Sequence, residues 1–194
     1  MHSLIAANLT AGTNPLIPSG FKPTVDLILS YGGSQVTMGN LFPTTVCTNP
    51  PNIMFFSEDP TKCSLSYTLM LIDPDAPTPQ SPIYADWCHW ILPGLRPTSY
   101  NEIIKTLLPI VPYYPPGPDP SSDPHRYIFL LYREPSPSLD SYVALKSENI
   151  GISNASALTR KSFNTSLFVE TYQLTLVGFN WFKAVDIQRF NEFK

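Results

Sequence analysis

Twenty-two prolines in 194 residues constrain this chain more than any other feature. An average soluble sequence of this length would carry about ten. Because proline fixes φ and lacks a backbone N–H donor, it interrupts helix interiors and is tolerated in loops, turns and sheet edges. The prolines therefore exclude a helical bundle and indicate a domain with many fixed loops.

Several segments between the proline and glycine clusters have the pattern of β-strands. Alternation of apolar and polar residues is typical of strands with one buried face, and short aromatic-rich apolar runs are typical of strands buried on both faces. These patterns predict strands at residues 25–31, 53–56, 66–72, 87–92 and 126–132.

One segment near the C-terminus predicts a helix, which begins at Ser153 or Asn154, since either residue can act as its N-cap. The apolar residues of this helix recur at helical spacing: Leu158, Phe163, Leu167 and Phe168. We find no internal repeat and no linker, so residues 1–194 are predicted to form one mainly β domain with a C-terminal helical cover.

Charged residues make up only 14% of the chain, and 12 basic against 15 acidic residues give a net charge of -3. Nucleic acid is therefore not an expected partner. No apolar run reaches the roughly 18 residues that a membrane-spanning helix needs, so no transmembrane segment is expected.

The compartment stays open between two alternatives. The N-terminus lacks the basic region and apolar stretch of a signal peptide, which favours the cytosol for the sequence as given. Three glycosylation sequons, at Asn8, Asn154 and Asn164, slightly favour the secretory pathway if a signal is missing.

The three cysteines, Cys47, Cys63 and Cys88, have no C-x-x-C spacing, which argues against a zinc site or a dense disulfide framework. If the chain is secreted, we expect a bridge between Cys47 and Cys63, with Cys88 free and buried. No short ligand spacing such as His-x-His supports a metal site either, so neither a metal nor a cofactor is expected.

The predicted strand at 66–72 ends in two carboxylates, Asp73 and Asp75, that Pro74 holds in a fixed geometry. The simpler interpretation is that each aspartate caps a turn by accepting backbone N–H groups. However, His89 and His125 lie in or beside strands expected to neighbour this turn. A histidine near a carboxylate can hold its proton near neutral pH and donate to an anionic or polar ligand.

Three motifs carry a resemblance to a known family: Asp73-Pro74-Asp75-Ala76-Pro77, Tyr84-Ala85-Asp86-Trp87-Cys88-His89-Trp90, and Pro124-His125-Arg126-Tyr127 with the apolar run that follows. The segments 36–40 and 160–168 fit the same pattern. Together they resemble the phosphatidylethanolamine-binding protein family, in the version found in fungi. The resemblance implies a large central antiparallel sheet packed on a smaller sheet, with C-terminal helices.

The resemblance also implies a small pocket at one end of the sheet that accepts phosphate or phosphoryl headgroups. Carried over by motif, the ligand-binding residues are Asp73, Asp75, Tyr84, Trp87, His89, Gly117, His125 and Tyr127. By strand alternation, Arg126 and Cys88 are expected to face away from the pocket.

The loop before His125 departs from the family pattern Gly-Pro-Pro-x-Gly-x-Gly-x-His-Arg-Tyr. Only its first glycine, Gly117, is kept; Ser121 and Asp123 replace the other two, and Asp119 replaces a proline. Because glycine allows close backbone approach to an anion, we expect phosphate to bind more weakly than in relatives with the full loop, by on the order of 1 to 2 kcal/mol.

Three functions follow as hypotheses. The first is a binding or regulatory module for a small anionic or polar ligand, with a protein partner also open. The second is an accessory or catalytic role in a fungal secondary-metabolite pathway, assisting dimerisation of small unsaturated acids or anhydrides, with Asp75, His89 and His125 as candidates to move a proton. The third is inhibition of a serine carboxypeptidase. The chain has no Gly-x-Ser-x-Gly and no HExxH motif, which argues against a serine hydrolase or zinc protease.

Overall fold

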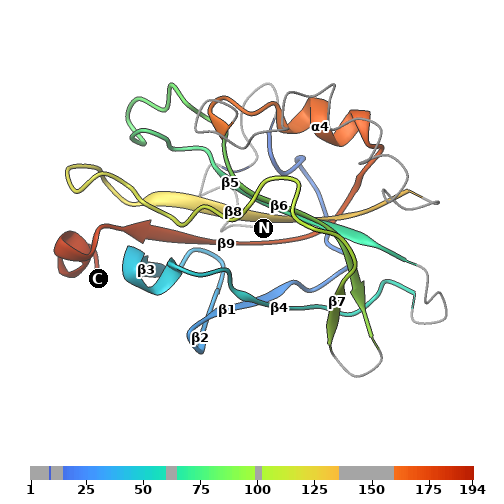
Figure 1. Ribbon diagram of the computed structural model, residues 1–194. Helices are drawn as coiled ribbons and strands as arrows, with labels where there is room; N and C mark the ends of the chain where they lie inside the picture. Colours follow the sequence, from blue (N-terminus) through green and yellow to red (C-terminus); the bar gives the residue numbers. More distant parts are fainter. Residues whose placement is uncertain (1–8, 10–14, 60–64, 99–101, 136–159) are drawn as a thin grey trace.

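The computed structural model describes residues 9, 15–59, 65–98, 102–135 and 160–194. In this part of the chain a six-stranded sheet has the order β3-β9-β8-β5-β6-β7 (Figure 1). Its strands are β3 (Leu41–Pro43), β5 (Tyr67–Asp73), β6 (Trp87–Pro97), β7 (Ile103–Lys105), β8 (His125–Arg133) and β9 (Thr175–Val185). A smaller sheet has the order β2-β1-β4, from β1 (Ile28–Tyr31), β2 (Ser34–Gln35) and β4 (Asn52–Met54).

The large sheet is buried on both faces, as its central strand β5 shows. All seven residues of β5 are buried. Leu69 and Leu71 belong to a core cluster shared with the small sheet, whereas Met70 and Ile72 belong to a second cluster that includes Phe168 of the helix α4 (Thr165–Thr171). Figure 1 shows the resulting layers, with α4 above the large sheet and the small sheet below it.

The mainly β fold predicted from the sequence is confirmed, and each predicted strand overlaps a strand of the structure. Strand β9 was not predicted, although it lies between β3 and β8. It also makes the sheet mixed, because β3 pairs with β9 in parallel while the other neighbours are antiparallel.

Two residues of β9 explain why its pattern is hard to read. Asn180 is buried in the strand and donates hydrogen bonds from Nδ2 to the backbone oxygens of Leu27 and Val36, which ties the two sheets together. A Cβ at Gly178 would lie 2.6 Å from the backbone oxygen of Val25, so only glycine allows this close approach. Both residues interrupt the apolar alternation.

The helix is shorter than predicted within the described residues. The expected start at Ser153 or Asn154, and Leu158, lie outside the described residues. Residues 161–162 form a turn, and α4 begins only after Asn164, whose side chain accepts a hydrogen bond from the backbone N–H of Leu167. Phe163 therefore precedes the helix, and its place in a continuous helical face was wrong. A short 3-10 helix, η2 (Ile187–Glu192), follows β9.

Two of the cysteines are buried free thiols: Cys47 in the 3-10 helix η1 (Thr44–Cys47) and Cys88 in β6. Burial raises the pKa of each thiol to about 12. Cys88 is thus free and buried as expected, and Cys47 is unbridged, while Cys63 lies outside the described residues. No helix in the described ranges is long and apolar enough to cross a membrane.

Candidate ligand-binding site

A pocket of about 430 Å³ lies where β5 ends and where β6 and β8 begin. Its walls include all the sequence-predicted residues except Asp75, namely Asp73, Tyr84, Trp87, His89, Gly117, His125 and Tyr127. Residues that the sequence reasoning did not place there complete the lining: Ala76, Pro77, Tyr114, Pro118, Asp119 and Lys161.

A β-bulge in β6 directs His89 into this pocket. Leu71 of β5 pairs with Trp90, and the next residue, Ile72, pairs with Cys88, so His89 is the extra residue of the bulge. Cys88 consequently packs in the α4-side cluster, facing away from the pocket as expected, whereas Trp90 packs in the small-sheet cluster. Bulges often redirect side chains beside functional sites.

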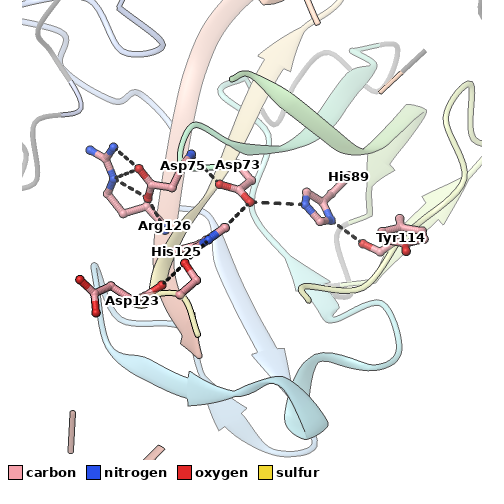
Figure 2. Close-up of polar contacts among 8 residues, drawn as sticks. Asp73, Asp75, His89, Tyr114, Asp123, His125 and Arg126 are labelled. Carbon is pink, nitrogen blue, oxygen red and sulfur yellow. Dashed lines mark hydrogen bonds and ion pairs between the residues drawn. The ribbon is translucent and has the colours of Figure 1, made fainter. Parts of the chain in front are cut away.

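Asp73, on the pocket wall, is the hub of the polar contacts drawn in Figure 2. Its Oδ2 atom accepts a hydrogen bond from His125 Nδ1 at 2.9 Å, and its Oδ1 atom accepts the backbone N–H of Asp75 at 2.7 Å. Burial alone would raise the pKa of Asp73, but the neighbouring imidazoles of His125 and His89 outweigh burial and lower it. The carboxylate is therefore negative at neutral pH, and it also caps the turn as the simpler interpretation predicted.

His89 offers one open ring nitrogen to the pocket. Its Nδ1 atom lies 2.8 Å from the backbone oxygen of Tyr114, and because a carbonyl only accepts, Nδ1 carries the hydrogen. Its Nε2 atom lies 3.9 Å from Asp73 Oδ2, which is too long for a hydrogen bond. His89 Nε2 is thus available to a ligand beside the Asp73 carboxylate.

His125 has both ring nitrogens engaged by the protein. Besides the Nδ1 contact to Asp73, its Nε2 atom lies 2.9 Å from the hydroxyl of Ser122. The order Ser122, His125, Asp73 is that of a serine-hydrolase relay. However, Ser122 is only 2% exposed and does not line the pocket. The backbone N–H groups of Ser121 and Ser122 are used by Asp119 rather than aimed at an oxyanion. The relay therefore positions His125.

Asp75 lies beside the pocket and not on its wall. Its carboxylate is bound by Arg126, through the backbone N–H at 2.7 Å, Nε at 2.9 Å and Nη2 at 2.5 Å (Figure 2). Arg126 faces away from the pocket, as strand alternation predicted. Its ion pair with Asp75 holds the Asp75 carboxylate away from the pocket wall as well. Because the oxygens of Asp75 serve this ion pair and Asp75 does not line the pocket, the geometry does not support the expectation that Asp75 contacts a ligand or moves a proton.

Trp87 contributes a donor that the protein itself does not use. Its indole Nε1–H is buried and has no hydrogen-bond partner among the described residues. Buried donors are seldom left unpaired, so an orphaned one on a pocket wall indicates a place for a ligand acceptor. Trp181 also has an orphaned buried Nε1–H, but it packs in the α4-side core and does not line this pocket.

The loop before His125, with Ser121 and Asp123 at the positions of two glycines in the family-like pattern, is held by side chains. Asp119 Oδ1 accepts both the backbone N–H and the hydroxyl of Ser121. Arg189 of η2 donates to the backbone oxygen of Ser122 at 2.8 Å and lies 3.8 Å from Asp123. Of the two extra carboxylates, only that of Asp119 belongs to a residue on the pocket wall.

Two adjacent basic residues have roles that sequence reasoning missed. Arg160 is buried and donates to the backbone oxygens of Cys88, His89 and Pro112, so it ties the start of β6 to the Tyr114 segment. Lys161 lines the pocket with its Nζ atom 4.0 Å from the centre of the Tyr84 ring. The one feature of the sequence that pointed to these two residues is that both lie in segment 160–168, which fits the family pattern.

Asp86, just before β6, gives a prediction about stability. Burial, together with the negative charge of Asp73, raises its pKa from 3.8 to about 6, although a hydrogen bond from Thr165 works against this. The folded state therefore binds more protons than the unfolded state between pH 4 and 6, and stability falls as pH rises through that window. We expect Asp86→Asn to stabilise the protein by on the order of 2 kcal/mol at pH 7.5 and to have little effect at pH 4.

Urea unfolding at the two pH values measures this effect. Asp26→Asn is the control, because Asp26 is exposed and its replacement should change stability by less than about 0.5 kcal/mol. An Asp86→Asn effect that is equal at both pH values would show that this carboxyl group does not titrate as described.

A second hollow of about 550 Å³ lies between α4 and the start of β9. Its described lining is mainly apolar or neutral, with Glu170 as the charged residue, and includes no histidine or aspartate. No group of three or more metal-ligating side chains was found among the described residues. The convergent polar groups thus favour the pocket at Asp73 as the functional site.

The architecture is that of a mainly β protein with a polar pocket at one end of a mixed sheet, and comparisons with known proteins show its family. The family model for phosphatidylethanolamine-binding protein matches residues 32–173, so the chain belongs to that family. The plant protein TERMINAL FLOWER 1 of Arabidopsis thaliana is 30% identical over 161 residues, covering 80% of this chain and 76% of the relative. MOTHER of FT and TFL1 homolog 2 of Oryza sativa subsp. japonica is 28% identical over 159 residues, covering 80% and 78%.

Solved structures agree on the fold. A carboxypeptidase Y inhibitor complexed with its cognate proteinase aligns with a TM-score of 0.75 at 22% identity, covering 95% of this chain and 94% of the inhibitor chain. The phosphatidylethanolamine-binding protein from Plasmodium vivax aligns with a TM-score of 0.70 at 22% identity, covering 95% and 96%.

Proposed function

We propose that this protein is a non-enzymatic binding module that takes a small anionic or polar ligand in the pocket at Asp73. The observation that carries the proposal is the set of unused polar groups on one pocket wall: the orphaned Trp87 N–H and the open His89 Nε2 beside the Asp73 carboxylate. A small-ligand site needs a few such convergent groups on a largely apolar surface. Family membership supports the same function.

Calorimetric titration with phosphorylethanolamine tests this proposal. Trp87→Phe keeps an aromatic ring but removes the N–H donor, and we expect it to weaken binding about tenfold, as for a lost hydrogen bond to a charged acceptor. Trp181→Phe removes the other orphaned N–H, away from the pocket, and should leave affinity within about twofold. Equal effects of the two variants, or no binding by the unmodified protein at millimolar ligand, would contradict the proposal.

The catalytic alternative is weaker than the binding one. With Asp75 held by Arg126 and both nitrogens of His125 engaged, His89 Nε2 is the remaining candidate to move a proton. Inhibition of a serine carboxypeptidase stays a hypothesis supported by fold likeness, which does not carry function. The fungal assignment and the weaker binding of phosphate stay predictions.

A further inference from the structure

The hollow between α4 and the start of β9 is a separate cavity from the pocket at Asp73. The pocket is lined by His125, the first residue of β8, whereas the hollow is lined by Tyr132, close to the end of the same strand. The two residues are about 23 Å apart along the strand, at about 3.3 Å per residue. One wall of the hollow is α4, which Figure 1 shows above the large sheet. Its volume of about 550 Å³ is in the range of small-molecule sites.

The lining of the hollow is apolar inside and polar at the rim. Four aliphatic side chains that are buried or partly buried line its inner part: Leu16, Val169, Leu174 and Leu176. The rim carries exposed polar residues, of which Glu170 is the charged one. No lysine, arginine or histidine lies on the described lining. Because burial of hydrocarbon is favourable, this surface suits a ligand that is mostly apolar.

Tyr132 places one polar group inside this apolar lining. Its side chain packs in the α4-side cluster, and the residue is only 4% exposed. Its hydroxyl makes no hydrogen bond with the described residues. The hydroxyl of Thr165, which also lines the hollow, is engaged because it donates to Asp86 Oδ2 at 3.3 Å. Since buried polar groups are seldom left unpaired, Tyr132 indicates a place for one hydrogen-bonding group of a ligand.

The charges around the hollow disfavour a charged head group beside Tyr132. Burial, together with the negative charge of Asp86, raises the pKa of Tyr132, so its phenol stays neutral. A carboxylate ligand would meet the same negative charge with no cation on the described lining to balance it. An ammonium group would lose its hydration beside a neutral phenol. A neutral head group avoids both costs.

We propose that this hollow binds an apolar small molecule with one neutral hydrogen-bonding group, such as an aliphatic alcohol. The polar group lies at the Tyr132 hydroxyl, and the hydrocarbon lies against the aliphatic inner lining. This second site does not depend on the proposed function, because it shares no residue with the pocket at Asp73.

Calorimetry with 1-octanol, octanoate and octylammonium tests the ligand class, because the three probes have the same chain length and differ in the head group. We expect 1-octanol to bind saturably at millimolar concentration or below, and the two charged probes to bind at least about tenfold more weakly at pH 7.5. With two fewer CH₂ groups, 1-hexanol should bind roughly tenfold more weakly than 1-octanol, since each buried CH₂ is worth about fourfold in affinity.

Tyr132→Phe tests the polar contact. It should weaken 1-octanol binding about fivefold, as for one lost hydrogen bond. It should not lower the Tm, because no hydrogen bond within the described protein is removed. Tyr172→Phe is the matched control: Tyr172 also packs in the α4-side cluster but does not line the hollow, so affinity should stay within about twofold.

Val169→Trp tests the location, because the larger side chain should fill the hollow and abolish 1-octanol binding while phosphorylethanolamine affinity is unchanged. Leu167→Trp makes the same substitution type on the exposed side of α4, away from the hollow, and should change neither affinity. In the unmodified protein, 1-octanol should show nuclear Overhauser contacts to the methyl groups of Val169 and Leu176.

Each result supports or overturns a stated part of the proposal. Octanoate or octylammonium binding as tightly as 1-octanol would overturn the neutral head group. A Tyr132→Phe effect below twofold would overturn the contact at Tyr132. Absence of saturable 1-octanol binding up to its solubility limit, or binding that survives Val169→Trp, would overturn the site. All of these results leave phosphorylethanolamine binding at Asp73 as a separate question, so the two proposals stand or fail independently.

Discussion

Asp73→Ala is expected to lower the free energy of unfolding by about 3 to 5 kcal/mol and to abolish ligand binding. The substitution leaves two buried donors without their acceptor, the backbone N–H of Asp75 and Nδ1 of His125. Each orphaned buried group costs about 1 to 3 kcal/mol. For a chain of this length the loss corresponds to a fall in Tm of roughly 10 °C, which differential scanning calorimetry measures directly.

Asp73→Asn is the matched control for this prediction. Its amide oxygen can still accept the backbone N–H of Asp75, and its NH2 group can donate to His125 if the imidazole moves its hydrogen to Nε2, where Ser122 can accept it. We therefore expect a loss of only about 1 to 2 kcal/mol. Equal losses for alanine and asparagine would show that the hydrogen bonds at Asp73 do not carry its contribution.

Arg126→Met is expected to cost about 3 kcal/mol. The Asp75 side chain is only 3% exposed, and without the guanidinium its charge would be buried with the backbone N–H of Arg126 as the remaining donor from that residue. Removing one partner of a buried ion pair is costly because the other charge stays desolvated. Chemical denaturation measures the loss, and the double variant Asp75→Asn/Arg126→Met should recover part of it, since no buried charge is then left unpaired.

Arg133→Met provides the comparison. Arg133 also pairs with a carboxylate, Glu58 at 3.0 Å, but its side chain is 38% exposed, so its removal should cost less than about 1 kcal/mol. If Arg126→Met and Arg133→Met destabilise the protein equally, burial of Asp75 does not determine the strength of its pair.

Strands could be predicted from the sequence where the order of apolar and polar residues depends only on which faces of the strand are buried. Segment 66–72 alternates polar and apolar residues up to Leu69 and is apolar from Leu69 to Ile72, and all of it except Ser66 lies in the buried central strand β5. In contrast, β9 contains Asn180 and Gly178, which make contacts with the small-sheet side of the fold. Because these two residues interrupt the alternation of apolar and polar residues, the sequence of β9 does not predict a strand. The continuity of the predicted helix through Phe163 was wrong, because residues 161–162 form a turn and Asn164 caps a new helix inside a segment whose apolar spacing also fits a longer helix.

Residues of the site could be predicted where a family-like motif lies on a strand, because strand alternation then indicates which of its side chains face the pocket. His125 and Tyr127 alternate with Arg126 on β8 and line the pocket as expected. Asp75 could not be assigned, because its partner follows from the pairing of segments that lie 51 residues apart. The hydrogen bond between Ser122 and His125 Nε2 depends on a loop conformation that Asp119 and Arg189 stabilise, so the sequence alone could not predict it. The place of Lys161 on the pocket wall likewise follows only from the folded chain.

Long-range ¹H–¹⁵N spectra of the imidazole rings, recorded while phosphorylethanolamine is added, test most directly that the pocket at Asp73 is the ligand site. The chain has three histidines, and His2, outside the described residues, serves as an internal reference. We predict that His89 carries its hydrogen on Nδ1 in the free protein and that its Nε2 resonance shifts saturably with the ligand, with the affinity that calorimetry gives. Calorimetric binding that leaves the His89 resonances unmoved would contradict this site.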